Sequence, residues 1–357
     1  MTKTPPPTMA LTAGSGPLCM QFVPRAAAPT GANLAAMVFG SGTTTPATPA
    51  AAHTPALQMA APPLGQTGDI GDVLELWHTD QPVHTGTQGL LHYALTDDVL
   101  FGAICIAQTD DGQAPQSPPL LQQASEQVYL AVFAALESLG YPHLLRVWNY
   151  LSDINAETGG MERYLQFNIG RQDAFRAKGQ PFLANAPAAC ALGTRSGGLQ
   201  VYFLAAKVAP LAIENPRQVS AYYYPGQYGP RTPSFSRASL ARLPRQRWLF
   251  ISGTASIVGH QSLHVGDVVA QSHETLRNIQ ALLDQANVAE GTKAWTLANL
   301  HYKVYVRFAA DLAAVQAVVD AQLPPAAVRI YLQADVCRAE LLMEIDATGC
   351  LPADLPS

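Results

Sequence analysis

The sequence predicts a mixed α/β (α+β) fold made of two tandem modules, with helices packed on one face of mixed sheets. A strand, helix, strand, helix order runs twice along the chain from residue 74 onward, and the helical segments carry apolar residues at the spacing of one helix face. The chain has 357 residues, of which 48% are hydrophobic. This is enough for two ordinary domains with a sizeable core, and it excludes wholesale disorder.

The first seventy residues have a different composition from the rest of the chain. Residues 1–16 are rich in Pro, Ala, Thr and Gly, and we expect a disordered tail there. Two short strands are expected at 18–23 and 33–40, meeting at the turn-prone residues 28–31 (APTG). Residues 41–70 are again rich in Pro, Ala and Thr and predict a long loop.

The two predicted modules span residues 17–180 and 181–357, and the second is expected to be catalytic. In the first module the expected elements are a strand at 101–106, a helix at 125–139, a strand at 144–150 and a helix at 161–175. In the second they are a strand at 248–256, a helix at 268–283, a strand at 300–308 and a helix at 311–321. We expect the active site between the modules.

Composition also limits the class of function. The net charge of −5 and the lack of a long basic run argue against nucleic-acid binding. No stretch has the roughly 18 uncharged apolar residues of a membrane-spanning helix, and the first sixteen residues lack the apolar core of a signal peptide. The five cysteines are scattered without a CxxC pair, and His260 and His264 have no evident third ligand. We therefore expect a cytoplasmic protein with reduced thiols and no metal.

Apolar and polar residues alternate along 328–337 and again along 341–346. If residues 338–341 connect these segments as an antiparallel hairpin, one face is apolar and is covered by helices. The other face then gathers the polar side chains Gln333, Asp335, Cys337, Glu344 and Asp346. Such a face is often simply a solvated sheet surface. However, Glu344 stands between Met343 and Ile345, where desolvation raises the pKa of a carboxyl group towards that of a general acid.

Several motifs, in one consistent order, resemble the chorismatases. They are 146–150 (RVWNY), 218–225 (QVSAYYYP), 227–237 (QYGPRTPSFSR), 250–256 (FISGTAS), 266–268 (GDV) and 271–279 (QSHETLRNI). The resemblance extends from about residue 18 to the carboxyl end. It implies modules similar to the YjgF (RidA) proteins, whose unit is a sheet with helices on one face. It also implies cleavage of chorismate to pyruvate and 3-hydroxybenzoate, with 4-hydroxybenzoate as a further product, and no metal or organic cofactor.

The implied reaction makes two demands on a site. Chorismate has an enol ether that must be protonated at the terminal carbon of the enolpyruvyl group, and a general acid of this kind contributes about 10² to 10⁴-fold in rate. Glu344 matches the position of the acid in the family. The two carboxylates of chorismate need cationic partners, and arginine binds a carboxylate bidentately. Arg231 and Arg146 are the first choices, followed by Arg171 and Arg338.

Further side chains are expected to contact the substrate. Successive side chains alternate on a strand, so that either Tyr223 or its two neighbours face the site; we choose Tyr223, together with Tyr228, as donors to substrate oxygens. Cys337, with Gln333, is expected to shape the product, because the resemblance places cysteine there in the subtypes that form 3-hydroxybenzoate. Ala255 leaves the hydrolytic product possible, because the resemblance implies a residue smaller than alanine near this position in some family members that form an aromatic product.

Three alternatives remain at this level. One is a hydrolytic chorismatase that releases a dihydroxycyclohexadiene carboxylate and pyruvate. Another is an imine deaminase of the YjgF-like type, in which Arg338 holds the substrate carboxylate and Glu344 orients water. The last is a non-catalytic module that binds aromatic acids. We expect a monomer, because a duplicated unit buries internally the surface that single modules bury by association.

Overall fold

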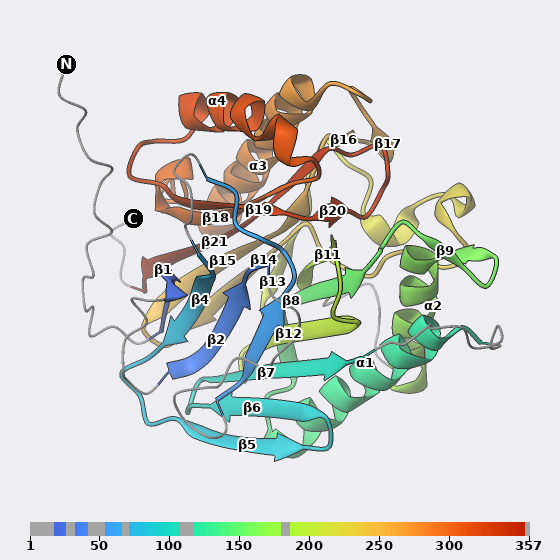
Figure 1. Ribbon diagram of the computed structural model, residues 1–357. Coiled ribbons are helices and arrows are strands. Elements are labelled where there is room, and N and C mark those ends of the chain that lie inside the picture. The colour runs from blue at the N-terminus through green and yellow to red at the C-terminus, as the bar shows by residue number, and fades with distance from the viewer. Residues whose placement is uncertain are drawn as a thin grey trace.

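The computed structural model describes residues 18–25, 33–41, 54–65, 71–107, 118–179 and 186–353. The predicted tail at 1–16 lies outside these residues. Figure 1 shows a mixed α+β architecture in which the sheets occupy the centre, α1 and α2 lie on one side and α3 and α4 on another. Among the described residues, no helix is long and apolar enough to cross a membrane.

The first large sheet has seven strands in the order β20-β11-β8-β12-β7-β6-β5. The strands are β5 (His84–Gln88), β6 (Leu91–Leu95), β7 (Val99–Ile106), β8 (His143–Ser152), β11 (Ala188–Thr194), β12 (Leu199–Ala206) and β20 (Asp335–Val336). Helices α1 (Leu120–Leu139) and α2 (Arg163–Ala177) pack on one of its faces through a shared apolar cluster. Helix α1 ends at Gly140, whose φ of 79° is the left-handed cap that glycine adopts without strain.

The second large sheet has six strands in the order β13-β14-β15-β21-β18-β19. The strands are β13 (Leu211–Ile213), β14 (Ala238–Leu243), β15 (Gln246–Thr254), β18 (Leu300–Val306), β19 (Val328–Gln333) and β21 (Met343–Pro352). Helices α3 (Val268–Glu290) and α4 (Leu312–Gln322) cover one face and share its apolar cluster. The Asp267 side chain caps α3 by accepting a hydrogen bond from the Ala270 amide.

The prediction of a repeated unit is confirmed by topology. Read in chain order, the strands β5, β6, β7, β8, β11 and β12 occupy the same relative places in the first sheet as β13, β14, β15, β18, β19 and β21 in the second. Both units also place one helix before and one helix after the fourth of these strands. Because β11 and β12 both pair with β8 of the first sheet, we propose that the division between modules falls after Ala206 rather than at residues 180 and 181.

A smaller sheet of four strands covers the helix-free side of both modules. Its order is β1-β4-β2-β3, formed by β1 (Cys19–Pro24), β4 (Val73–His78), β2 (Asn33–Phe39) and β3 (Ala56–Met59). Trp77 of β4 contacts Phe101 and Trp148 of the first sheet and Trp248 of the second, with ring centroids 5.7, 6.0 and 5.6 Å away. The three sheets therefore enclose one central core.

Two expectations for this region are wrong. The strands β1 and β2 do not pair with each other, because β4 lies between them and pairs antiparallel with both. The expected loop at 41–70 contains β3, which pairs in parallel with β2. Its four residues, ALQM, are too few to give a periodic signal.

The predicted hairpin near the carboxyl end is also wrong. Strand β18 lies between β19 and β21, parallel to the first and antiparallel to the second. The chain leaves the second sheet after Gln333, and β20 pairs with β11 of the first sheet. A period-two pattern shows which residues share a face of one strand, but not which strand lies beside it.

The remaining short elements lie mostly in the loops around the site. They are the pairs β9 (Glu157–Thr158) with β10 (Met161–Glu162) and β16 (Ile257–Val258) with β17 (Gln261–Ser262), and the 3₁₀ turns η2 (Ala221–Tyr223), η3 (Gly226–Tyr228), η4 (Leu297–Asn299) and η5 (Ala309–Asp311).

Candidate active site

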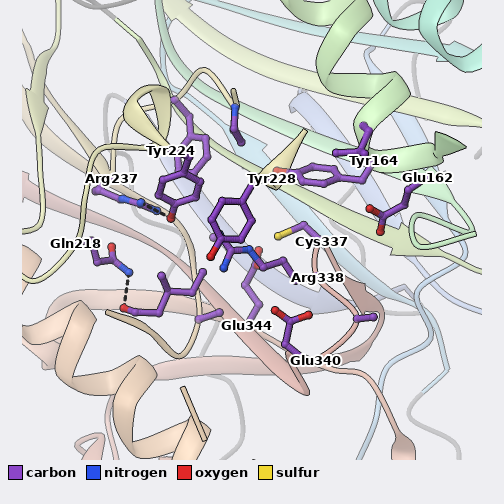
Figure 2. A pocket seen from close by; sticks show the side chains of 17 residues that line it. Glu162, Tyr164, Gln218, Tyr224, Tyr228, Arg237, Cys337, Arg338, Glu340 and Glu344 are labelled. Carbon is purple, nitrogen blue, oxygen red and sulfur yellow. Dashed lines mark hydrogen bonds between the residues drawn. The ribbon is translucent and has the colours of Figure 1, made fainter. Parts of the chain in front are cut away.

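A pocket of about 410 Å³ opens between the two modules. The first module contributes side chains at the start of α2, and the second contributes the β15 end, the loop before β14 and the segment before β21. The lining residues are Glu162, Tyr164, Leu165, Gln218, Tyr224, Tyr228, Pro233, Phe235, Arg237, Gly253, Ala255, Ile257, Cys337, Arg338, Ala339, Glu340 and Glu344. Figure 2 shows these side chains from close by.

Glu344 is the buried acid of this pocket. It lies on β21, its residue is 3% exposed, and its Oε1 atom has no hydrogen-bond partner within the described part of the chain. Burial and the nearby Asp346 carboxylate raise the pKa of Glu344 to about 8, although Arg146 and Arg307 act in the opposite direction. Glu344 therefore carries a proton at neutral pH.

A β-bulge places this acid. Between β15 and β21, Ile251 pairs with Ala347 and Thr254 pairs with Ile345, so that Ser252 and Gly253 together oppose one residue of β21. Gly253 leaves free the space that the Glu344 carboxylate occupies, since a β-carbon at residue 253 would overlap it. The Ser252 hydroxyl accepts a hydrogen bond of 2.8 Å from the Ala189 amide, which fixes the bulge to the first sheet.

Two arginines of the pocket lie near one tyrosine ring, that of Tyr224. The guanidinium of Arg338 lies 4.1 Å from the Tyr228 ring centroid and 5.2 Å from that of Tyr224. Arg237 lies 5.5 Å from the Tyr224 ring and donates a hydrogen bond of 2.7 Å to its hydroxyl. Figure 2 shows both arginines beside these rings. Arg338 donates from one nitrogen to the His260 carbonyl and the Ser262 hydroxyl. Arg237 donates from one nitrogen to the Val219 carbonyl and the Tyr224 hydroxyl. Within the described residues, each guanidinium therefore keeps further N–H groups for an anion.

Comparison with known proteins identifies the family. Residues 75–205 match the family model described as chorismatase FkbO/Hyg5-like, N-terminal. A chorismatase from Streptomyces rapamycinicus is 37% identical over 280 residues, which cover 76% of this chain and 80% of the relative. The chain belongs to the chorismatase family.

Two further matches agree with this chorismatase assignment. A protein from Streptomyces hygroscopicus named 3-hydroxybenzoate synthase is 37% identical over 285 residues, covering 76% of this chain and 80% of its own. A crystal structure of a chorismatase superposes with a TM-score of 0.82 at 32% identity, and the match covers 94% of this chain and 98% of that one. The similarity thus includes both modules of the fold.

Five of the residues that sequence analysis selected line the chorismatase pocket: Glu344, Cys337, Tyr228, Arg338 and Ala255. Cys337 lies close to Glu344, and burial together with that carboxyl group raises the pKa of its thiol to about 12. The thiol is therefore neutral at physiological pH. The hydroxyl of Tyr228 lies 3.1 Å from Nδ1 of His260.

Three of the selected residues lie away from the pocket near the surface. Tyr223 is 65% exposed, because residues 221–223 form a 3₁₀ turn and strand alternation does not apply to it. The Arg231 side chain is 34% exposed, and its guanidinium lies 3.9 Å from the Asp173 carboxylate. Gln333 accepts a hydrogen bond from Arg195 at the edge of β19.

Two selected arginines are buried behind the pocket. Arg146 extends from β8 into the central core, where it lies 3.2 Å from the Asp346 carboxylate. Arg171 is buried on α2, where it donates a hydrogen bond of 2.9 Å to Asn168 and lies over the Phe167 ring. Neither arginine lines the pocket. The sequence did not predict this, because the pattern of a strand or helix does not show which of its faces meets a cavity.

Sequence reasoning missed several lining residues. Three of them, Arg237, Tyr224 and Gln218, lie within the motifs that carry the family resemblance. Their place in these motifs was the one feature of the sequence that could have indicated a role at the site. Glu162 and Tyr164 belong to the first module, and nothing in their local pattern indicates that they meet the second.

Proposed function

We propose that this protein cleaves chorismate to pyruvate and 3-hydroxybenzoate, with Glu344 as the general acid. The observation that carries the proposal is a buried carboxyl group with a raised pKa, at a pocket that also holds two arginines. The names of the two Streptomyces relatives give the substrate and the product. Because the pKa of Glu344 is about 8, the group has its proton available at neutral pH, as an acid catalyst requires.

In the proposed reaction, Glu344 transfers its proton to the terminal carbon of the enolpyruvyl group. The C–H bond forms with the electrons of the alkene, which leaves an oxocarbenium ion on the side chain and a carboxylate on Glu344. A ring hydroxyl of the substrate adds to the oxocarbenium carbon and gives up its proton. The bond from that carbon to one of its two ring oxygens then breaks, together with the ring C–O bond of the other oxygen, and pyruvate is released. The first oxygen stays on the ring and takes up a proton, and the ring proton that is lost restores the acid form of Glu344. The aromatic product thus forms without net consumption of water. Capture by water gives instead the hydrolytic product.

We propose that Arg338 and Arg237 bind the substrate carboxylates and that Tyr228 donates a hydrogen bond to a substrate oxygen. Both guanidinium groups lie within 5.5 Å of the Tyr224 ring centroid, and a planar cationic fork suits a carboxylate. The neutral thiol of Cys337 and the methyl group of Ala255 border the same cavity. We propose that they exclude water from the cation and so favour capture by the ring hydroxyl.

Incubation of the purified protein with chorismate, followed by chromatography and a pyruvate assay, tests this function. We expect equal amounts of pyruvate and 3-hydroxybenzoate. A dihydroxycyclohexadiene carboxylate would show a hydrolytic enzyme instead. Ammonia release from 2-aminoacrylate without chorismate turnover would show a deaminase, and tight binding of aromatic acids without turnover would show a non-catalytic module.

We propose further that the enzyme is a cytoplasmic monomer. The small sheet and both large sheets already cover each other's helix-free faces in one core, which leaves that surface unavailable for association. All five cysteines are free thiols, as expected in a reducing compartment. Light scattering on the purified chain distinguishes a mass near that of one chain from a multiple of it.

A further inference from the structure

A cluster of buried charges lies behind Glu344 in the central core. Asp346 is 1% exposed and projects from the same face of β21 as Glu344, two residues along the strand. Its carboxylate lies 3.2 Å from Arg146 of the first sheet and 3.7 Å from Lys303 of β18. It also accepts a hydrogen bond of 3.0 Å from the Tyr305 hydroxyl. Asp346 thus connects β21 to β18 within the second sheet and to β8 of the first sheet.

The cluster continues into the small sheet. Lys303 donates a hydrogen bond of 2.7 Å to Glu75 of β4 and another of 2.9 Å to the Tyr202 hydroxyl. Glu75 also accepts hydrogen bonds from Trp77 and Tyr202. Each of these charged side chains is buried, so that water screens none of them strongly.

The formal charges of this cluster cancel without Glu344. Asp346 and Glu75 contribute two negative charges, and Arg146 and Lys303 contribute two positive charges. Arg307, the other arginine that acts on Glu344, has its own carboxylate partner, Asp335, at 2.7 Å. An ionised Glu344 would therefore be a surplus buried charge, and such a group binds a proton instead.

Arg338 and Arg237 line the pocket itself and are the proposed partners of the substrate carboxylates, so they are not counted in the cluster behind it. The other titratable groups near Glu344 do not alter the count. Cys190 of β11 and Cys337 are thiols whose pKa burial raises, and Tyr150 and Tyr305 are buried phenols with a raised pKa. All four are neutral at physiological pH. From β15, the neighbour of Glu344 is Gly253, which has no charge.

We propose that Asp346 is a positioning residue for the acid: its carboxylate pairs with Arg146 and Lys303, so that neither of these two cations is available to an ionised Glu344, and Glu344 stays in its proton-bearing form. This inference rests on the proposed role of Glu344 as the acid. Asp346 itself does not line the pocket and acts through Glu344.

Infrared titration of the protein measures the effect directly. The protein is labelled with ¹³C-glutamate, and the spectrum of Glu344→Gln is subtracted as the reference. The band of the protonated Glu344 carboxyl then gives the midpoint of its titration, which is the pH at which half of these groups are ionised. Asp346→Asn removes a like charge, and we expect the midpoint to fall by about one pH unit or more. Arg146→Met removes an opposing cation, and we expect a rise. The double variant should lie between the two.

A purely structural role for the cluster predicts a different pattern, in which the variants lose activity with unchanged midpoints. Glu290→Gln is the matched control, because Glu290 is a buried carboxylate paired with Arg242 and Arg247 outside the pocket. Its midpoint for Glu344 should equal the wild-type value. Should Asp346→Asn fail to fold, as judged by circular dichroism, Arg146→Met and the double variant decide. An unchanged or lowered midpoint in Arg146→Met overturns the proposal.

The pH dependence of pyruvate release provides a second readout. In Asp346→Asn the loss of activity at high pH should begin at a lower pH than in the wild type, with activity recovered on acidification. If the wild-type protein does not turn over chorismate at all, the proposed function fails. The infrared titration still determines whether Asp346 controls the protonation of Glu344, so that the two failures remain distinct.

Discussion

The α-carbon of Gly253 borders the carboxylate of Glu344 so closely that any β-carbon at residue 253 would overlap Oε1 of that carboxylate. Gly253→Ala should therefore displace the proposed acid. Because a misplacement of about 1 Å can cost roughly 10²-fold in rate, we expect kcat for pyruvate release to fall by that order, with a smaller change in KM. Gly226→Ala is the control, since an added β-carbon meets nothing there, and it should retain wild-type kcat.

The two arginines of the pocket should dominate substrate affinity. A hydrogen bond to a charged group contributes about 1.5–3 kcal/mol, so that Arg338→Met or Arg237→Met should raise the KM for chorismate by about 10-fold or more. Arg245→Met, which removes an exposed arginine paired with Asp80, should leave KM unchanged. Equal KM values for the pocket variants and the wild type would remove these arginines from substrate binding.

Glu344 should also make stability depend on pH. Its pKa is about 8 in the folded state against an ordinary value of 4.5, so that between these values only the folded state holds the proton. Stability from this group is therefore present at low pH and is lost as pH rises through that window, by about 1.4 kcal/mol per unit. Urea unfolding at several pH values should show this slope in the wild type and a weaker one in Glu344→Gln. Identical slopes in the two proteins would contradict the raised pKa.

Cys337 should influence which product forms rather than whether the ether is cleaved. Its neutral thiol borders the cavity beside Glu344, and Cys337→Ala opens space for water. We expect a larger share of the hydrolytic product or of 4-hydroxybenzoate, with pyruvate release within about 10-fold of wild type, since no proton donor is lost. Cys350→Ala, which lies outside the pocket, is the control. An unchanged product ratio in Cys337→Ala would show that the thiol does not select the product.

Helices and long strands of this fold were predictable because their signals are local. The apolar stripe that predicts a helix at 268–283 begins where α3 begins, at Val268, and the glycine that ends α1 was visible as a stop signal. Strand partners were not predictable in the same way. Nothing in the alternation of 328–337 shows that β18 separates β19 from β21, since pairing depends on the whole fold.

The burial of Glu344 was predictable from the sequence, whereas its surroundings were only partly so. A glutamate between two apolar strand residues indicates burial, and the structure places Glu344 there. The bulge at Ser252 and Gly253, and the approach of Arg146 from the other sheet, depend on contacts between the modules. Tyr223 was chosen on strand alternation, but a turn that ends before Pro225 points it into solvent.

Pyruvate release by Glu344→Gln under single-turnover conditions tests the central claim most directly. The variant keeps the shape of the side chain and removes its acidic proton, so we expect chorismate to bind with near wild-type affinity while pyruvate release falls by about 10² to 10⁴-fold. Release of pyruvate at the wild-type rate by this variant, with folding verified by circular dichroism, would contradict the assignment of Glu344 as the acid.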